Sequence, residues 1–243
     1  MNLISLNIWG GHIKNPLLDF VCTHRDIDLF CFQEVYHDAK YKISTEKERN
    51  YALNIFSELQ ENLPEHQGFF RPVVDRVYGL ALFVRKTIDI LGEGEILIHE
   101  NPHYPGRGPT HARNLQWVEL IVNNKKYAIL NIHGLWNGLG KSDTPERIAQ
   151  SLRIKDFLET INIPKVMCGD FNLRPDTKSI KILEEGMDNL IEKHGIQSTR
   201  TVLYPKEEKF ADYILTSPDI KVNDFFVLSD EVSDHAPLFL SFS

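Results

Sequence analysis

Cysteine is scarce in this sequence: Cys22, Cys31 and Cys168 are the only three among 243 residues. An odd number without metal-type spacing argues against a disulfide framework and against a zinc site. Because Cys31 and Cys168 lie within apolar runs, we expect them to be buried free thiols. Free thiols suit a reducing compartment, which predicts a cytoplasmic location.

Long apolar runs are also missing. No segment approaches the roughly 20 apolar residues of a membrane-spanning helix. The first residues lack the basic region and apolar helix of a signal peptide, so none is expected. The chain has no internal repeat, low-complexity segment or linker, and we therefore expect residues 1–243 to form one monomeric domain.

Positive charge is not in excess either. Asp and Glu number 34 against 27 Lys and Arg, which gives a formal net charge of −7. This weakens a nucleic-acid hypothesis without excluding it, because a local cationic rim or a bound metal can still attract phosphate.

Short apolar runs bounded by Gly, Pro or Asn are abundant, and this pattern predicts β-strands. Four segments instead have helical periodicity or helix-start signals, such as Thr144 as N-cap followed by Pro145. Strands are predicted at 3–9, 28–35, 79–84, 88–99, 115–122, 125–132, 166–168, 209–215, 222–228 and after 235. Helices are predicted at 16–24, 45–62, 145–161 and 177–185.

The most informative stretch is the apolar run 166–168 with the residues that follow it. Gly169, Asp170 and Asn172 come directly after the run. If the chain is still extended there, the side chains of Asp170 and Asn172 leave the same face. Together they could hold a hard cation, a water molecule or a phosphate oxygen. A simple polar turn is the alternative interpretation.

The same pattern recurs along the chain, because polar side chains stand at the ends of several other apolar strands. Each of them alone has an ordinary structural explanation, such as a turn-forming Asn or a structural His. Strand ends that meet at one rim of a sheet build a site there, so the recurrence predicts a functional site. Its members are Asn7, Glu34, His133, Asp170 with Asn172, Asp212, and Asp234 with His235.

Two further features are candidates for substrate binding. The loop 101–113 carries Arg107 and Arg113 together with two histidines and no acidic residue, which suits a rim that faces phosphate. An ordinary surface loop is equally compatible with this composition. Trp136, in a glycine-rich loop, could stack on a base, contact a lipid or close an edge of the core.

With these residues in view, the chain resembles the endonuclease/exonuclease/phosphatase superfamily of metal-dependent phosphoesterases. The resemblance spans residues 3–240, nearly the whole chain, and its motifs occur in the family's order. They are Leu6-Asn7-Ile8, Phe32-Gln33-Glu34, Asn131-Ile132-His133, Gly169-Asp170-Phe171-Asn172, Asp212-Tyr213-Ile214-Leu215 and Ser233-Asp234-His235. It implies an α/β four-layer sandwich, in which two mixed β-sheets pack face to face with helices outside.

The resemblance also implies a divalent cation, Mg²⁺ or Mn²⁺. Glu34 would be its principal ligand, assisted by Asn7 and Asp234. Carboxylate oxygens are ligands that these cations prefer, and the cation would neutralise phosphate oxygens.

The other motif residues take catalytic roles in this resemblance. Asp170 would orient or deprotonate the attacking water or support the leaving oxygen, and Asn172 would hold the phosphate. His235, oriented by Asp212, would contact the phosphate and share in proton transfer. His133 would stabilise the phosphoryl oxygens.

The chain also departs from parts of the family. Repair endonucleases usually carry an acidic residue where Trp9 stands, and another residue where His133 stands, so abasic-site repair is not favoured. A nuclease acting on DNA or RNA is the first functional prediction. A phosphodiesterase or phosphatase acting on a lipid or small phosphate ester is the alternative, and a non-catalytic binding module on the same scaffold is the second alternative.

Overall fold

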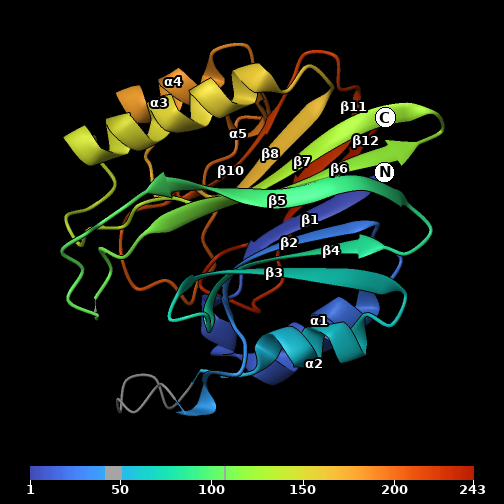
Figure 1. Cartoon of the computed structure of the whole chain (residues 1–243), viewed down its shortest axis with the longest axis horizontal. Helices are drawn as coiled ribbons and strands as arrows, with labels where there is room; N and C mark the ends of the chain where they lie inside the picture. Colours follow the sequence, from blue (N-terminus) through green and yellow to red (C-terminus); the bar gives the residue numbers. More distant parts are fainter. Residues whose placement is uncertain (42–50, 107) are drawn as a thin grey trace.

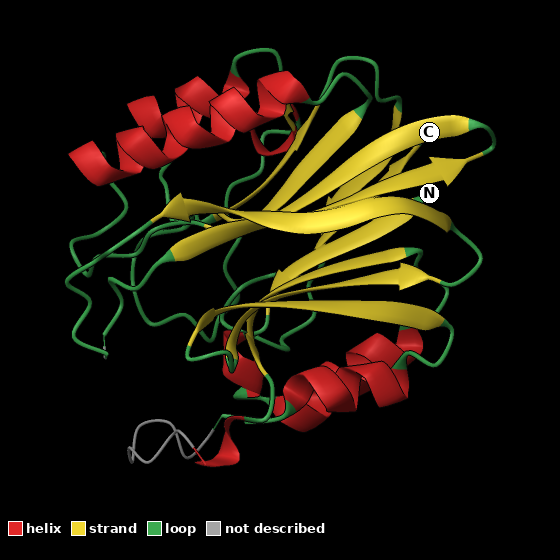
Figure 2. Ribbon diagram, viewed as in Figure 1, coloured by secondary structure: helices red, strands yellow, loops and turns green. Residues whose placement is uncertain are grey.

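The computed structural model describes residues 1–41, 51–106 and 108–243. Two six-stranded sheets lie face to face, and helices cover their outer faces (Figures 1 and 2). Helices α1 (Lys14–Thr23) and α2 (Ile55–Asn62) lie outside the first sheet, whereas α3 (Pro145–Thr160) and α4 (Lys178–Glu184) lie outside the second. The α/β four-layer sandwich predicted from the resemblance is thus confirmed.

The strand order is β11-β12-β1-β2-β4-β3 in the first sheet and β5-β6-β7-β8-β10-β9 in the second. Both sheets are mixed, because β1 runs parallel to β2 and β7 parallel to β8, while the other pairs are antiparallel. The first-sheet strands are β1 (Asn2–Asn7), β2 (Leu29–Tyr36), β3 (His66–Val74), β4 (Tyr78–Arg85), β11 (Val222–Val227) and β12 (Leu238–Phe242). The second-sheet strands are β5 (Asp89–His99), β6 (Arg113–Val122), β7 (Lys125–His133), β8 (Lys165–Asp170), β9 (Asp188–Asn189) and β10 (Asp212–Thr216).

Strand β1 shows how the sequence alternation places a polar residue between the sheets. Ile4 and Leu6 belong to the core under α1 and α2, whereas Leu3 belongs to the core between the two sheets. Successive side chains of a strand point to opposite faces, so Asn7 lies on the same face as Leu3. Its amide therefore enters the space between the sheets at the end of the strand.

Several local predictions are confirmed. Residues 115–122 and 125–132 form a hairpin whose turn residues, Asn123 and Asn124, have φ of 50° and 62°. Two consecutive left-handed residues give a turn whose twist matches the flanking strands. The side chain of Thr144 accepts a hydrogen bond from the backbone N–H of Arg147 and so caps α3. The three cysteines are free, and Cys31 and Cys168 are buried.

The helix predicted at 45–62 is wrong in its first part among the described residues, and residues 45–50 lie outside them. Residues 51–54 are not helical, and α2 begins at Ile55. The backbone N–H of Ala52 donates to Gly10, and the carbonyl of Leu53 accepts from Ala39. These contacts take the backbone groups that an earlier helical turn would need.

Other elements were not predicted or end elsewhere. Strand β3 escaped prediction because it contains Gly68 and Pro72, which an edge strand tolerates. The strand predicted at 3–9 ends at Asn7, and a 3₁₀ turn follows at Trp9–Gly11. Strand β9 and helix α5 (Leu190–Lys193) are too short for a periodic signal. Among the described residues, no helix is long and apolar enough to cross a membrane.

Candidate active site

The polar residues predicted at strand ends gather at one end of the two sheets. In the second sheet, His133 ends β7 and pairs with Asp170 at the end of β8, and Asp170 in turn lies opposite Asp212 at the start of β10. These three residues are therefore lateral neighbours on adjacent strands. In the first sheet, Asn7 at the end of β1 lies beside Gln33 of β2.

Glu34 faces this site because strand β2 bulges there. The pairing of β2 with β4 shifts register between Phe32 and Val35, and Glu34 has a left-handed φ of 59°. In a regular strand Glu34 would share the face of Phe32, which packs under the helices. A bulge of this kind redirects a side chain. Gln33 points between the sheets instead, where its Nε2 donates to Asn131 Oδ1 at 2.7 Å.

Glycine and an Asx turn shape the loop after β8. Gly169 has φ of 135°, and a Cβ atom there would lie 2.1 Å from the carbonyl oxygen of Ile132. Asn172 has φ of 53°, so the chain is not extended beyond Asp170 and the expected shared strand face is wrong. The backbone N–H of Asn172 donates to Asp170 Oδ1 at 2.8 Å, and its Nδ2 donates to the Gly134 carbonyl at 3.2 Å. The turn after β8, rather than the alternation of side chains along the strand, brings Asp170 and Asn172 together.

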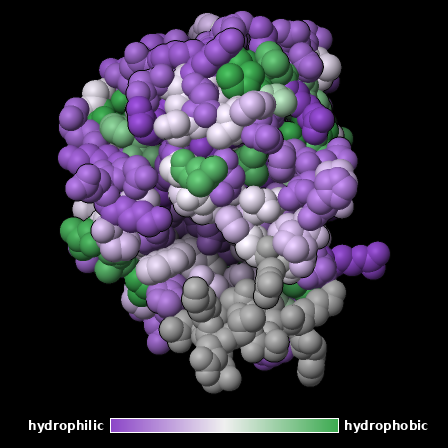
Figure 3. Space-filling view, turned by 90° about the vertical axis from the view of Figure 1, so that its left-hand side faces the viewer, coloured by the Kyte–Doolittle hydropathy of each residue, from purple (hydrophilic) through white to green (hydrophobic). Residues whose placement is uncertain are grey.

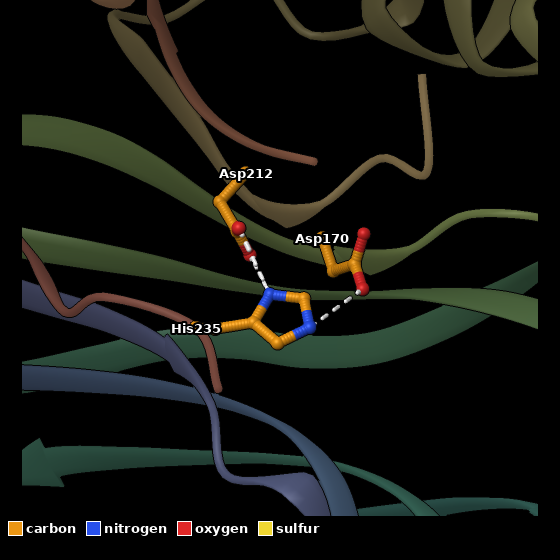
Figure 4. Close-up of side chains that lie close together, drawn as sticks. All are labelled: Asp170, Asp212 and His235. Atoms are coloured by element: carbon orange, nitrogen blue, oxygen red, sulfur yellow. Dashed lines mark hydrogen bonds and ion pairs between the residues drawn. The ribbon is translucent and has the colours of Figure 1, made fainter. Parts of the chain in front are cut away.

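His235 and Asp212 form a buried hydrogen-bonded pair (Figure 4). His235 Nδ1 lies 2.8 Å and 2.9 Å from the two carboxylate oxygens of Asp212, and Thr199 Oγ1 donates to Asp212 Oδ2 at 3.1 Å. Burial and the Arg200 guanidinium oppose protonation of His235, but the Asp212 and Asp170 carboxylates outweigh them and raise its pKa. The free Nε2 faces Asp170 Oδ2 at 3.7 Å.

His133 lies in the opposite electrostatic environment. Its Nε2 is 3.7 Å from Asp170 Oδ2 and 3.9 Å from Glu34 Oε1. Burial, reinforced by the nearby Arg113 guanidinium, lowers the pKa of His133 well below its usual value. The site therefore holds one neutral imidazole and one, His235, that is disposed to carry a proton. Titratable groups whose environments push their pKa values apart are typical of acid–base sites.

Asp170 is the carboxylate shared by both histidines. Burial disfavours its charged form, yet His235, His133, Lys141 and Arg200 together hold the pKa of Asp170 well below its usual range. Its side chain is almost completely buried, at 3% exposure. Asp170 is therefore ionised throughout the neutral pH range and accepts hydrogen bonds only.

Glu34 and Asp234 have the donor chemistry for a divalent cation. Burial, together with repulsion from the Asp234 and Asp170 carboxylates, raises the pKa of Glu34 despite the counteracting His235 and Asn7. Among the described residues, no Lys or Arg lies within 4 Å of the Glu34 carboxylate. A carboxylate in this state is stabilised by a bound cation. Glu34 and Asp234 therefore fit the predicted metal site.

Asn7 fits the metal-ligand prediction less directly. Its Nδ2 donates to Glu34 Oε1 at 3.1 Å and to Asp170 Oδ2 at 3.0 Å, while its Oδ1 accepts the backbone N–H of Trp9 at 3.0 Å. In this orientation Asn7 holds the two carboxylates together, and ligation through Oδ1 would require the amide to turn over. Asp170, Asp212 and His235 also bring ligand atoms within 4.8 Å of one another. A cation among those three would displace the hydrogen bond between Asp212 and His235, so we favour the Glu34 side.

A cavity of about 590 Å³ is lined by six of the strand-end residues, Glu34, His133, Asp170, Asn172, Asp234 and His235, but not by Asn7 or Asp212. Figure 3 looks onto this end of the molecule, where the surface is hollowed among hydrophilic and intermediate residues. The cavity wall includes residues that the strand-end pattern did not indicate: Tyr78, Lys141, Arg200, Tyr204 and Lys206. They lie in loops or at strand starts and have no periodic signal. Burial lowers the pKa of Lys141 to about 8.

Two of the three predicted substrate-binding residues line the same cavity. Arg113 is buried at the start of β6. Trp136 also lines the cavity, and Lys206 Nζ lies 5.3 Å from the centroid of its ring. Arg107 lies outside the described residues.

Comparison with solved structures finds proteins of the same fold. A structure of a mannosyl-6-phosphatase from Bacteroides thetaiotaomicron is 19% identical, with a TM-score of 0.78 over 100% of this chain and 99% of that one. A humanised TDP2 from D. rerio is 16% identical, with a TM-score of 0.74 over 100% and 98%. The human nocturnin catalytic domain with bound sulfate is 20% identical, with a TM-score of 0.67 over 100% and 93%. These likenesses show the shared fold.

Sequence comparison gives a narrower result than structure comparison. No curated protein sequence matches significantly. The model of the endonuclease/exonuclease/phosphatase family, in contrast, matches residues 4–235, a span that contains every strand-end residue described above. The chain therefore belongs to the endonuclease/exonuclease/phosphatase family.

Proposed function

We propose that this protein is a divalent-metal-dependent phosphoesterase and that its substrate is a phosphate ester of a nucleic-acid strand or nucleotide. Family membership supports hydrolysis of phosphate esters. The observation that carries the proposal is the pair of histidines with opposite pKa shifts on either side of the ionised Asp170. This arrangement favours catalysis over a non-catalytic binding module, because groups with divergent pKa values are typical of acid–base sites.

Glu34 and Asp234 would hold Mg²⁺ or Mn²⁺ in this proposal. When bound, the cation would supply charge that neutralises phosphate oxygens. His133, being neutral, donates its Nε2–H to a phosphoryl oxygen. Asn172 offers its second amide hydrogen to the phosphate, because the first is donated to Gly134.

The proton transfers fall to Asp170 and His235. Asp170 accepts a proton from the attacking water as the new P–O bond forms, with its carboxylate fixed by Asn7 and by the backbone of Asn172. His235 gives its Nε2 proton to the ester oxygen as the old P–O bond breaks. Asp212 keeps the imidazole oriented through Nδ1. Positioned general acids and bases of this kind contribute about 10²–10⁴-fold to the rate.

Aromatic and cationic side chains on the cavity wall support a nucleotide. The Arg200 guanidinium lies 4.0 Å from the ring centroid of Tyr204, and Lys206 lies over Trp136. Rings next to cations are typical of sites that stack bases and bind phosphate. The net charge of −7 argues against extended contact with a polymer, so recognition is confined to the cavity.

A small phosphate ester is the second candidate. The cavity volume of about 590 Å³ falls within the range of small-molecule sites, about 300–1,000 Å³. One protein of similar fold is a mannosyl-6-phosphatase, which extends the candidates to sugar phosphates.

The test is a substrate panel measured with Mg²⁺, Mn²⁺ or EDTA. It contains single-stranded DNA, duplex DNA, RNA, a nucleoside monophosphate, a sugar phosphate and a lipid phosphodiester. We expect metal-dependent turnover of a nucleic acid or nucleotide that Asp170→Asn loses and that the exposed control Asp156→Asn retains. Turnover of the sugar phosphate alone moves the proposal to the second candidate, and turnover of the lipid alone refutes both. No turnover at all refutes the phosphoesterase proposal.

A further inference from the structure

Arg200 is built into the wall of the cavity beside His235. Residues 200 and 235 form an isolated antiparallel bridge, which fixes the backbone of Arg200. Its guanidinium packs on Tyr204, and Nη1 makes a long contact of 3.4 Å with Asp234 Oδ2. The side chain is 7% exposed, and Nε has no hydrogen-bond partner. A buried guanidinium with an unused N–H is a costly arrangement unless another group completes it.

Arg113 presents the same feature near His133. Its Nη2 donates to the carbonyl oxygen of Pro109 at 3.2 Å, while Nε and Nη1 are buried without a partner. The residue is 3% exposed and also lines the cavity. Arg113 and Arg200 thus leave three guanidinium nitrogens unpartnered in one cavity.

The charges of the described residues on the cavity wall are balanced before any cation or substrate enters. Among the described lining residues, four are acidic and four are Lys or Arg. The acidic ones are Glu34, Asp75, Asp170 and Asp234, and the basic ones are Arg113, Lys141, Arg200 and Lys206. A divalent cation would leave these described residues with an excess of two positive charges, because His133 is neutral and the charge of a protonated His235 is offset by its partner Asp212. Two negative charges match that excess.

We propose that Arg113 and Arg200 bind the terminal oxygens of a dianionic phosphate group, so that the substrate is a phosphomonoester at a strand end or on a small molecule. This inference rests on the proposed phosphoesterase function. Water attacks phosphorus, the P–O ester bond breaks, the leaving oxygen takes up a proton, and inorganic phosphate is released.

The chemistry distinguishes the two ester classes. A monoester dianion carries three terminal oxygens, whereas an internal diester carries two and a single charge. Guanidinium groups recognise such oxygens through their fixed fork of N–H donors. With a diester, one buried donor stays unpartnered, and this costs about 10- to 100-fold in binding. The second ester substituent must also fit against the same arginines.

A matched substrate pair tests the inference. p-Nitrophenyl phosphate and methyl p-nitrophenyl phosphate have the same leaving group and differ by one methyl group and one charge. We expect kcat/KM of the wild-type protein with Mg²⁺ to be at least about 10-fold higher for the monoester. Arg200→Gln should lower the monoester value about 10- to 100-fold and the diester value much less. For Arg200→Lys, kcat/KM for the monoester should lie between those of the wild type and Arg200→Gln. The exposed control Arg153→Gln should change kcat/KM for neither ester.

Inhibition of the wild-type protein tests the inference without any variant, so misfolding of a variant cannot affect the result. Inorganic phosphate should compete with substrate at a concentration at least about 10-fold lower than dimethyl phosphate. Equal inhibition by both, or equal losses on the two esters in Arg200→Gln, overturns the inference while leaving the phosphoesterase function in place. Absence of turnover of both esters, together with silence on the wider panel, instead refutes the proposed function itself.

Discussion

We expect Glu34→Gln to make the metal-free protein more stable while removing most of its activity. Burial and the Asp234 and Asp170 carboxylates raise the pKa of Glu34. An acid whose pKa is higher in the folded state reduces the free energy of unfolding at pH values above its unfolded pKa, because deprotonation costs more in the fold. The neutral amide avoids this cost at neutral pH. Its oxygen can still accept from Asn7 Nδ2, as Glu34 Oε1 does at 3.1 Å.

The size of the effect follows from typical magnitudes. Relieving a destabilised active site contributes about 0.5–2 kcal/mol. For a chain of this size about 1 kcal/mol moves Tm by about 2–4 °C, so Glu34→Gln should melt about 1–8 °C higher in EDTA. Mg²⁺ at a hundred times its Kd stabilises the wild type by about 2.7 kcal/mol, or about 5–11 °C. The variant lacks the principal ligand and should gain little.

Differential scanning calorimetry of both proteins in EDTA and in Mg²⁺ measures this directly. The order of the two Tm values should reverse when the metal is added, which a general effect on folding cannot produce. The exposed control Glu61→Gln should follow the wild type in both conditions. The reasoning is refuted if Glu34→Gln melts below the wild type in EDTA, or if Mg²⁺ raises both Tm values equally.

Three further predictions use other parts of the structure. Asp212→Asn should lower kcat about 10³- to 10⁴-fold with little change in KM, because the amide no longer orients His235. An unchanged kcat would show that Asp212 has no role in the reaction. KM for a phosphate ester should rise as pH increases through about 8, where Lys141 loses its proton. This rise should be absent in Lys141→Arg, and a rise in both proteins would exclude Lys141 as its cause. The free energy of unfolding should fall below about pH 6.5 by up to about 1.4 kcal/mol per pH unit for each buried neutral His, because the unfolded chain takes up the proton first. His66, whose pKa burial lowers, contributes to this fall, so urea titrations should show a shallower decline in His66→Gln.

The fold class was predicted from the family resemblance, and one rim of the site was predicted from the strand ends. Alternation on β1 and β7 placed Asn7 and His133 at strand ends, and the strand register then brought His133 beside Asp170. The periodicity and the end of a strand can each be recognised from a short stretch of sequence. Residues far apart in the chain could therefore be assigned to the same rim of a sheet. The same reasoning failed for Glu34 in one respect, since a regular strand would have turned it toward the helices and only the bulge redirects it.

Loop residues of the site could not be found in this way. Arg200 is placed at the cavity by a single bridge to His235. Lys141 lies in a loop, and its Nζ donates a hydrogen bond to the carbonyl oxygen of Phe210. Neither position has the strand periodicity or the strand-end pattern that identified the other residues of the site. Their place depends on long-range contacts that only the folded chain creates. Edge strand β3 was missed for a related reason, since its Gly68 and Pro72 break the local pattern while sheet pairing overrides them.

Residue type also leaves the protonation of the two histidines open, although that protonation decides their chemistry. His133 and His235 both stand at strand ends and both are buried, yet their pKa values move in opposite directions. Burial alone would keep each imidazole neutral. The Asp212 carboxylate, which accepts a hydrogen bond from His235 Nδ1–H, reverses this for His235 together with Asp170, whereas Arg113 reinforces it for His133. The difference in protonation between the two histidines is therefore set by their charged neighbours, above all Asp212 for His235 and Arg113 for His133, rather than by residue type.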